Sequence, residues 1–176
     1  MAGMPLRMIV ASLERQAGLI GLLTLRSMGY EVMVITKDPY IAELVKNPLQ
    51  SIHSPEAHEI MKQADLFVNV HGREILTPDE LAMPKYGCIN IHPCLWKYPG
   101  MRPIRRLLAD GGTFASVAAH IMTERVDVGP ILEQRYTDIN GLKTEVEVYN
   151  QLYYFYPRVI LQAVPEMYCL MGNQEF

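Results

Sequence analysis

The sequence predicts an α/β domain with a mainly parallel sheet flanked by helices. Short apolar runs of strand length alternate with longer segments in which apolar residues recur at helical spacing. The connections between these segments are short, and proline or glycine marks several of their ends. Alternation of this kind builds parallel strands with crossover helices, and ligands then bind beyond the carboxyl ends of the strands.

Three strands and three helices are expected in the first half of the chain. The strands are expected at residues 6–11, 31–36 and 65–70. The helices are expected at residues 16–28, 39–45 and 55–63. Gly29 would cap the first helix in a left-handed conformation, and Asp38 would be the N-cap of the second. Ile52 is assigned to a minor strand.

The second half of the chain is expected to complete the sheet. Its strands are expected at residues 88–92, 117–122 and 130–137. Its helices are expected to begin at Pro78, Pro103 and Thr144. The last of these is one long closing helix over 144–170, in which Pro157 and Pro165 could introduce bends.

The composition is that of one soluble globular domain, which we expect to span residues 1–176. Hydrophobic residues make up 49% of the chain and charged residues 20%, as in an ordinary globular protein with one core. The formal net charge is −3, and basic residues are scattered apart from a small group at Arg102, Arg105 and Arg106. No nucleic-acid partner is expected, because binding would require a broad basic face.

Cysteine usage and the lengths of the apolar runs predict a cytoplasmic protein without a membrane partner. Cys88, Cys94 and Cys169 have no C-x-x-C spacing, so neither a disulfide framework nor a zinc site is indicated. The histidines lack a metal-ligand spacing as well, and no metal is expected. The apolar run at 17–25 is shorter than the roughly 18 residues of a membrane span and has no signal-peptide cleavage site.

The segment 87–100, GCINIHPCLWKYPG, contains the first candidate site. Asn90 and His92 are two residues apart on the expected strand, so their side chains leave the same face. Pro93 ends the strand because it has no amide hydrogen to donate to a neighbour. An amide and an imidazole would thus lie at the mouth of the sheet, where they could stabilise a developing oxyanion and transfer a proton.

A carboxylate that could complete this site lies in the loop at 124–130. Gly129 and Pro130 can hold Asp127 in a fixed position between two strands. Asp127 could orient His92, raise its pKa, or accept a proton through water. From spacing alone, an Asn-x-His pair in a strand is more often structural than catalytic.

Five segments carry a resemblance to a known family. They are REILTP (73–78), INIHPCLWKYPG (89–100), ADG (109–111), HIMTE (120–124) and VDVGPIL (126–132). Together they resemble the folate-dependent formyltransferases, which include glycinamide ribonucleotide, methionyl-tRNA and nucleotide-sugar enzymes. The resemblance extends from about residue 65 to residue 164, and it implies a Rossmann-like formyltransferase fold.

The resemblance also implies a reaction and a role for each site residue. In this family a formyl group moves from N10 of 10-formyltetrahydrofolate, the formyl donor, to a primary amine. By matching motif, Asn90 would hold the formyl oxygen, His92 would stabilise the tetrahedral intermediate as an acid, and Asp127 would manage the proton that the amine loses. The pterin pocket would be lined by Arg73, Glu74, Ile75, Leu76, Thr123, Glu124, Val126 and Asp127.

The acceptor of the formyl group is expected to be a small-molecule amine, with a nucleotide-linked amino sugar as the first choice. Residues 12–16, SLERQ, replace the glycine-rich turn with which glycinamide ribonucleotide enzymes hold a phosphate, and Glu14 would repel that phosphate. Trp96, Lys97, Tyr98 and Arg102 follow the candidate strand and could bind the substrate. Trp96 is equally well explained as a hydrophobic anchor, whereas a solvated helix face is the more common environment for an arginine such as Arg102.

Several alternatives remain open at this level. The same residues are compatible with glycinamide ribonucleotide formyl transfer, with hydrolysis of formyltetrahydrofolate, and with a folate-binding protein that has no turnover. His120 matches a histidine of the family but could equally be a core residue. The tyrosines of the last helix are expected in core packing or on a dimer surface, so a homodimer is one expected assembly.

Overall fold

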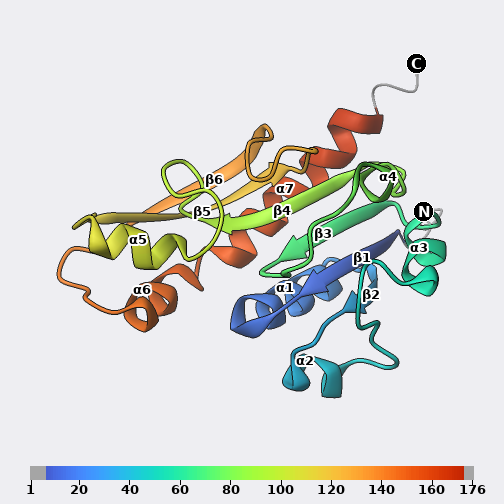
Figure 1. Ribbon diagram of the computed structural model, residues 1–176, viewed down its shortest axis with the longest axis horizontal. Helices are drawn as coiled ribbons and strands as arrows, with labels where there is room; N and C mark the ends of the chain where they lie inside the picture. The colour runs from blue at the N-terminus through green and yellow to red at the C-terminus, as the bar shows by residue number, and fades with distance from the viewer. Residues whose placement is uncertain (1–6, 173–176) are drawn as a thin grey trace.

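The computed structural model describes residues 7–172, in which six strands form one sheet with helices on both faces (Figure 1). The strands are β1 (Met8–Leu13), β2 (Glu31–Ile35), β3 (Leu66–Val70), β4 (Cys88–Pro93), β5 (Phe114–Ile121) and β6 (Ile131–Asp138). The helices are α1 (Arg15–Ser27), α2 (Pro39–Leu44), α3 (Pro55–Met61), α4 (Pro78–Leu81), α5 (Pro103–Ala109), α6 (Glu145–Leu152) and α7 (Tyr156–Gly172).

The sheet has the order β2-β1-β3-β4-β5-β6. The β1–β2, β1–β3 and β3–β4 pairs are parallel, whereas β4–β5 and β5–β6 are antiparallel. The prediction of an α/β domain with a mainly parallel sheet is therefore confirmed. The strand order changes direction at β1, so the carboxyl ends of β1 and β3 flank a topological switch point, where open α/β sheets bind ligands.

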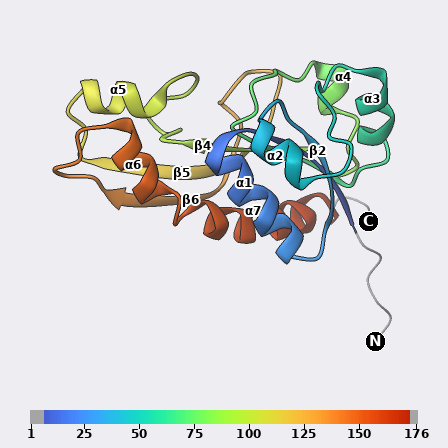
Figure 2. The same cartoon turned by 90° about the horizontal axis from the view of Figure 1, so that it is seen from below.

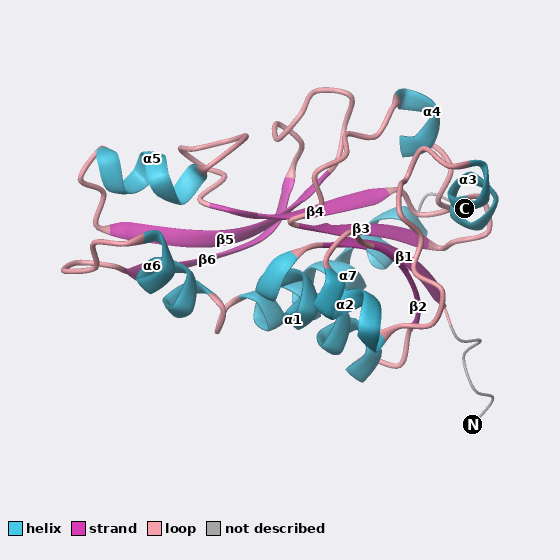
Figure 3. Ribbon diagram, turned by 60° about the horizontal axis from the view of Figure 1, so that its bottom comes forward, coloured by secondary structure: helices cyan, strands magenta, loops and turns pink. Residues whose placement is uncertain are grey.

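Alternation along the central strands divides the core between the two faces of the sheet. Phe67 and Cys88 pack with residues of α3 on one face, and Leu66 and Ile89 pack with α1 and α7 on the other. Figure 2 shows α1 and α7 below the sheet and α3 and α4 above it. In Figure 3, α5 and α6 flank the β5–β6 end of the molecule. Because Asn90 is two residues from Cys88, its side chain points to the same face of the sheet as that of Cys88, which is the face covered by α3.

Four helices begin at a residue whose side chain accepts a hydrogen bond from the first turn, as N-cap residues do. These residues are Asp38, Ser54, Thr77 and Thr144. Proline follows directly at the first three, where its fixed φ suits a helix start. The predicted starts of α2, α3, α4 and α6 are confirmed by these caps.

The closing helix differs from the prediction, because the chain forms α6 and α7 in place of one helix over 144–170. Pro157 has no amide hydrogen for the carbonyl oxygen of Tyr153, so the chain leaves the helix at 153–155 and starts again at Tyr156. Pro165 lies inside α7 without ending it. The strand assignment of Ile52 is also wrong: Leu49 makes the isolated bridge to Ile35, and Ile52 is buried in the following turn.

Within residues 7–172, the chain forms no helix that is both long enough and apolar enough to cross a membrane.

Candidate functional site

Asn90 and His92 lie at the carboxyl end of β4, as the sequence predicts, on the same face of the strand. Asn90 is 7% exposed, and the side chain of His92 is 12% exposed. The neighbouring strand β3 places Asn69 directly opposite Asn90. Two side-chain amides therefore lie next to each other on adjacent parallel strands.

Asn69 fixes the orientation of the Asn90 amide. Its Nδ2 donates to Oδ1 of Asn90 at 2.9 Å, so the Oδ1 side of Asn90 is occupied by this bond. The Nδ2 of Asn90 is then directed the other way, toward Oδ1 of Asp127 at 3.2 Å and Nε2 of His120 at 3.2 Å. The end of Asn90 that faces the site is consequently a hydrogen-bond donor.

The loop between β5 and β6 brings Asp127 to this cluster. Asp127 has φ of +57°, in the left-handed region that few residues other than glycine adopt but that Asp and Asn tolerate better than most. Gly129 passes so close to the end of β5 that a Cβ there would overlap the carbonyl oxygen of Ile121. The prediction that Gly129 fixes the loop has a physical basis in this close approach.

Both oxygens of the Asp127 carboxylate contact site residues. Oδ2 accepts from the backbone N–H of Gly100 at 2.7 Å and lies 3.2 Å from Nε2 of His92. Oδ1 accepts from Asn90 and lies 3.4 Å from Nε2 of His120. The three residues predicted from sequence thus form one cluster at the end of β4.

The contacts of Asp127 keep its carboxylate ionised. Burial pushes the pKa of Asp127 upward, but the contacts with His120 and His92 and the Gly100 amide outweigh burial and bring the pKa to about 2. At neutral pH the cluster therefore contains a carboxylate that can accept a proton.

His92 is a neutral hydrogen-bond donor in this arrangement. Its Nε2 faces two acceptors, Oδ2 of Asp127 and the carbonyl oxygen of Gly100 at 3.1 Å, so Nε2 carries the proton. Its Nδ1 is buried without a hydrogen-bond partner. Burial lowers the pKa of His92, and this effect exceeds the raising effect of Asp127. Asp127 does raise the pKa of His92, as expected, but the net pKa is lowered because burial has the larger effect.

Three neighbours complete the cluster beyond the predicted triad. His120 is 1% exposed and pairs with Asn90 across the antiparallel β4–β5 ladder, so its ring belongs to the polar cluster in addition to being buried. Asn69 and Gly100 were not predicted. A signal for Asn69 was present in the sequence, since it is the one polar residue of the buried strand LFVNV. Gly100 could be found only through the three-dimensional contact with Asp127.

The residues predicted to line the pterin pocket lie in two segments, one that follows β3 and one that carries Asp127. Arg73 and Ile75 are exposed, whereas Leu76 is buried and the Glu74 carboxylate bonds to Lys37, Ser51 and Ile52. Thr123, Glu124 and Val126 are exposed on the loop that carries Asp127.

The four predicted substrate residues have different environments. Trp96, Lys97 and Arg102 are exposed beyond β4. Tyr98 is only 4% exposed, and its hydroxyl donates to Asp110 at 2.8 Å. Its ring packs in the core and its hydroxyl is already bonded, so the Tyr98 side chain is not free to contact a substrate in this conformation.

A cavity of about 300 Å³ opens at the switch point between β1 and β3. It is lined by side chains of α1, of α6 and of the segments that follow β3 and α6, including Arg15, His71, Glu145, Tyr149, Asn150 and Tyr153. The rings of Tyr149 and Tyr153 are stacked with centroids 6.1 Å apart. Among the described residues, no group of three or more His, Cys, Asp or Glu side chains is arranged to hold a metal ion.

An amide donor, a neutral imidazole donor and an ionised carboxylate lie together at the end of a parallel strand, and these are the kinds of group that acyl-type transfer uses, because charge develops on a carbonyl oxygen in that reaction. The sequence model of the formyl transferase family matches residues 15–164. The chain belongs to the formyl transferase family.

Curated relatives and solved structures agree with this assignment. A methionyl-tRNA formyltransferase of Synechococcus sp. (strain JA-3-3Ab) is 42% identical over 90 residues, which are 51% of this chain and 28% of the relative. Another, from Thermotoga neapolitana, is 32% identical over 122 residues, 67% of this chain and 39% of the relative. The chain therefore spans well under half the length of these curated relatives.

The fold is that of solved formyltransferases. The phosphoribosylglycinamide formyltransferase of Bacillus halodurans superposes with a TM-score of 0.71 and 22% identity, covering 90% of this chain and 95% of that one. The N-formyltransferase of Helicobacter canadensis, solved with folinic acid and dTDP-3-aminofucose, gives a TM-score of 0.72 with 16% identity, covering 94% and 65%. The predicted Rossmann-like formyltransferase fold is confirmed.

Proposed function

We propose that this chain transfers a formyl group from 10-formyltetrahydrofolate to a primary amine. The observation that carries the proposal is the cluster of Asn90, His92 and Asp127, in which Asn90 and His92 each place a nitrogen 3.2 Å from an oxygen of the Asp127 carboxylate. The Nδ2 of Asn90 and the Nε2 of His92 donate toward the formyl oxygen, on which negative charge develops as the amine adds. Asp127 accepts the proton that the amine loses, and the proton then passes to N10 as its bond to the formyl carbon breaks.

The formyl donor would lie between the two segments predicted to line its pterin ring. The first segment follows Gly72, whose carbonyl oxygen lies 3.4 Å from Nδ2 of Asn69, and its Leu76 packs in the core on the α3 face, the face to which Asn90 points. The second segment, 123–127, carries Asp127 itself. Exposed side chains such as Ile75, which is 65% exposed, offer apolar surface for a ring system.

The acceptor that we propose first is a nucleotide-linked amino sugar bound in the cavity between β1 and β3. The stacked rings of Tyr149 and Tyr153 offer faces for a sugar or base, and Arg15, Glu145 and Asn150 offer hydrogen bonds and charge of both signs. The turn after β1 does not favour a phosphate, because the N–H of Arg15 already donates to Asp38 and the Glu14 carboxylate lies in the same turn.

A second acceptor is favoured by a separate observation. The curated relatives with the highest identities reported above are methionyl-tRNA formyltransferases. An aminoacyl-tRNA acceptor would place its methionyl amine at the same cluster, with the rest of the tRNA outside the cavity.

A panel of acceptors tests both proposals. The purified chain is mixed with 10-formyltetrahydrofolate and, in separate reactions, a set of nucleotide-linked amino sugars, glycinamide ribonucleotide, charged initiator methionyl-tRNA, or no acceptor. Release of tetrahydrofolate that depends on an amino sugar supports the first choice, and release that depends on methionyl-tRNA supports the second. Equal release without any acceptor would indicate hydrolysis, and no release under any condition would contradict formyl transfer.

A further inference from the structure

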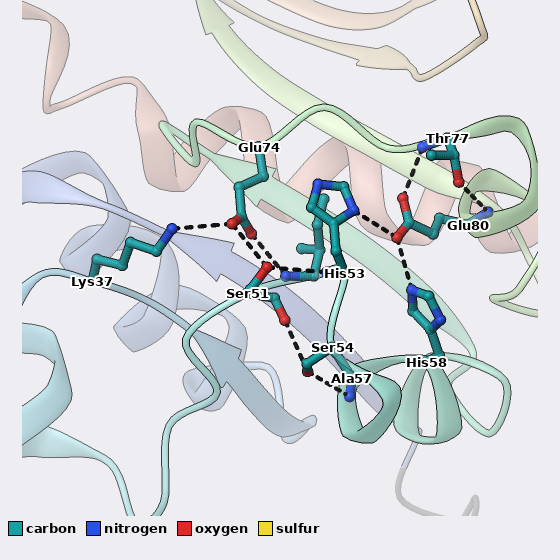
Figure 4. A network of polar contacts seen from close by, with 10 residues as sticks. Lys37, Ser51, His53, Ser54, Ala57, His58, Glu74, Thr77 and Glu80 are labelled. Atoms are coloured by element: carbon teal, nitrogen blue, oxygen red, sulfur yellow. Dashed lines mark hydrogen bonds and ion pairs between the residues drawn. The ribbon is translucent and has the colours of Figure 1, made fainter.

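The segment 72–77, between β3 and α4, has no helix or strand of its own, although it includes half of the predicted pterin-binding residues. Its conformation therefore depends on side-chain contacts more than on a backbone ladder. Figure 4 shows two carboxylates, Glu74 and Glu80, that connect this segment and the start of α4 to Lys37 before α2, to the chain between α2 and α3, and to His58 of α3. We call these two carboxylates and their partners the loop brace.

Glu80 forms one half of the loop brace. Its side chain is 3% exposed, and its Oε1 lies 2.8 Å from Nδ1 of His53 and 2.8 Å from Nε2 of His58. Its Oε2 accepts from the backbone N–H of Thr77 at 2.8 Å, which closes the capping box of α4. A single carboxylate thus ties the end of the segment 72–77 to α3 and to the turn before it.

Glu74 forms the other half. Its Oε1 accepts from Nζ of Lys37 at 3.0 Å and from the hydroxyl of Ser51 at 2.9 Å. Its Oε2 accepts from the backbone N–H of Ile52 at 2.7 Å. Both oxygens of the Glu74 side chain are therefore engaged by residues of other segments, which leaves its backbone as the part that we expect to face a bound donor.

Both carboxylates are ionised at neutral pH. Burial pushes the pKa of Glu80 upward, but the hydrogen bonds with Thr77, His53 and His58 outweigh it and hold the pKa near 2. The pKa of Glu74 is also lowered, since its bonds to Ile52, Lys37 and Ser51 exceed the effect of burial. Charged hydrogen bonds are stronger than neutral ones, so the loop brace restrains the segment more than neutral contacts would.

Leu76 lies between the two carboxylates and packs in the same core cluster as Ile52, Ala57 and Met61. The segment is consequently held at Glu74, at Leu76 and at the Thr77–Glu80 cap. Between these points the backbone of 73–76 has little freedom to move. Its preceding residue, Gly72, lies next to Asn69, the residue that orients Asn90, because the Gly72 carbonyl oxygen is 3.4 Å from Nδ2 of Asn69.

We propose that Glu74 and Glu80 are positioning residues, which hold the backbone of 72–77 in the conformation that binds the formyl donor. The inference rests on the proposed function, and it goes further by assigning a role to residues that do not touch the donor through their side chains. His53 and His58 act here as hydrogen-bond partners of Glu80 rather than as metal ligands.

Three variants test the loop brace. Glu74→Ala removes all three bonds of Glu74, whereas Glu74→Gln keeps an oxygen that can accept from Ile52. Glu80→Gln likewise keeps an acceptor for the Thr77 N–H and the helix cap, but loses the charge that faces the two histidines. Glu59→Gln is the matched control, because Glu59 is an exposed residue of α3 whose ion pair with Lys62 at 2.7 Å does not involve the segment.

The first measurement is hydrogen exchange at the amides of 72–77, with the amides of β3 and β4 as an internal reference. Glu74→Ala and Glu80→Gln are expected to speed exchange in the segment and to leave the reference strands unchanged. Unchanged exchange in both variants would overturn the loop brace. This readout does not require activity, and Glu74→Gln and Glu80→Gln provide it if Glu74→Ala does not fold.

The second measurement is the affinity for folinic acid, together with kcat and KM for 10-formyltetrahydrofolate. We expect Glu74→Ala to weaken folinic acid binding about tenfold, as expected for loss of charged hydrogen bonds, with Glu74→Gln between it and the native chain. KM for the donor should rise in parallel while kcat changes little. Faster exchange with unchanged affinity and KM would overturn the positioning role.

These outcomes separate the inference from the proposed function. If the native chain neither binds folinic acid nor releases tetrahydrofolate, the proposed function fails and the donor-positioning role fails with it, while the exchange data still decide whether the loop brace restrains the segment. If the native chain binds and turns over but the variants match Glu59→Gln, the loop brace alone fails.

Discussion

Two carboxylates of this protein have nearly the same surroundings. Asp127 lies within 3.4 Å of ring nitrogens of His92 and His120, and Glu80 lies 2.8 Å from ring nitrogens of His53 and His58. Both are mostly buried, and both have a pKa of about 2 because their contacts with histidines and with backbone N–H groups outweigh burial. A carboxylate between two histidines therefore does not by itself identify a catalytic group.

The difference lies in the backbone that carries each carboxylate and in the groups beside it. Glu80 is in the first turn of α4, where it forms a capping box with Thr77, a common motif of helix starts. Both of its carboxylate oxygens are occupied by hydrogen bonds within the protein. Asp127 is held in a left-handed conformation on a loop, next to the donor end of Asn90 at the carboxyl end of β4. His92 beside it retains a buried Nδ1 without a partner. Because strained backbone and a polar group left without a partner occur together at this strand end, we propose the Asp127 cluster, and not the Glu80 cluster, as the functional one.

The largest expected effect comes from exchanging a histidine in each cluster. His92→Gln should lower kcat by about 10² to 10⁴, the range for losing a group that assists proton transfer and charge stabilisation. His58→Gln should change kcat less than about threefold, because the Glu80 cluster acts through the donor-binding segment. Steady-state kinetics on both variants decide this, and equal losses in kcat would contradict the distinction between the clusters.

A smaller effect is expected from substituting Gly129, the glycine whose close approach to β5 fixes the loop that carries Asp127. Gly129→Ala introduces a Cβ that overlaps the carbonyl oxygen of Ile121, so we expect about 2 kcal/mol or more of lost stability together with lost turnover. Gly141→Ala is the control: its φ is +88° but no atom lies near the added Cβ, so it should lose about 1 kcal/mol and keep turnover. Denaturant unfolding and kinetics measure both, and a fully active Gly129→Ala variant would argue against a fixed Asp127.

The orientation of Asn90 should contribute about a factor of ten. Asn69→Ala removes the donor that holds Oδ1 of Asn90, so the amide can turn and present its oxygen in place of Nδ2. We expect kcat to fall about tenfold while folinic acid binding changes little. If Asn69→Ala lowered binding and left kcat unchanged, the oriented-amide interpretation would be wrong.

The smallest expected effect is on the pH dependence of folding stability, and the two carboxylates should share it. Because their pKa values in the folded protein are about 2, against ordinary values of 3.8 for Asp127 and 4.5 for Glu80, each stabilises the fold above those ordinary values. That contribution is lost as pH falls toward 2. Asp127→Asn and Glu80→Gln should each lose less stability than the native chain between pH 4.5 and 2, as measured by denaturant unfolding at several pH values. A change in one variant only would show that the resemblance between the clusters is superficial.

The fold and the triad follow largely from local sequence signals. Capping residues such as Asp38 and Thr77 place helix starts, and the alternation of Ile89, Asn90 and Ile91 places the two polar residues of β4 on one face. Asp127 was found because Gly129 marks a constrained loop and because the VDVGPIL segment matches a family.

Other features depend on contacts between distant segments, which local patterns do not encode. The end of α6 at Leu152 precedes Pro157 by several residues, and the bond between Gly100 and Asp127 joins two loops. Tyr98 illustrates the same limit: an aromatic residue after a catalytic strand suggests a substrate contact, yet its ring is buried and its hydroxyl bonds to Asp110. The bonds of Glu74 and Glu80 to residues more than 20 positions away could be seen only in the folded chain.

The central claim is that the Asp127 carboxylate acts in the chemical step, and that at this residue only the backbone lines the pocket of the formyl donor. Asp127→Asn keeps the shape of the side chain and an oxygen that can accept from Gly100, but it removes the base. Turnover of 10-formyltetrahydrofolate with the acceptor found in the panel, measured beside folinic acid binding on the same preparation, tests the claim most directly. We expect turnover to be abolished and the dissociation constant to stay within about threefold of the native value. Near-full turnover in Asp127→Asn, or a loss of folinic acid binding equal to the loss of turnover, would contradict the role assigned to Asp127.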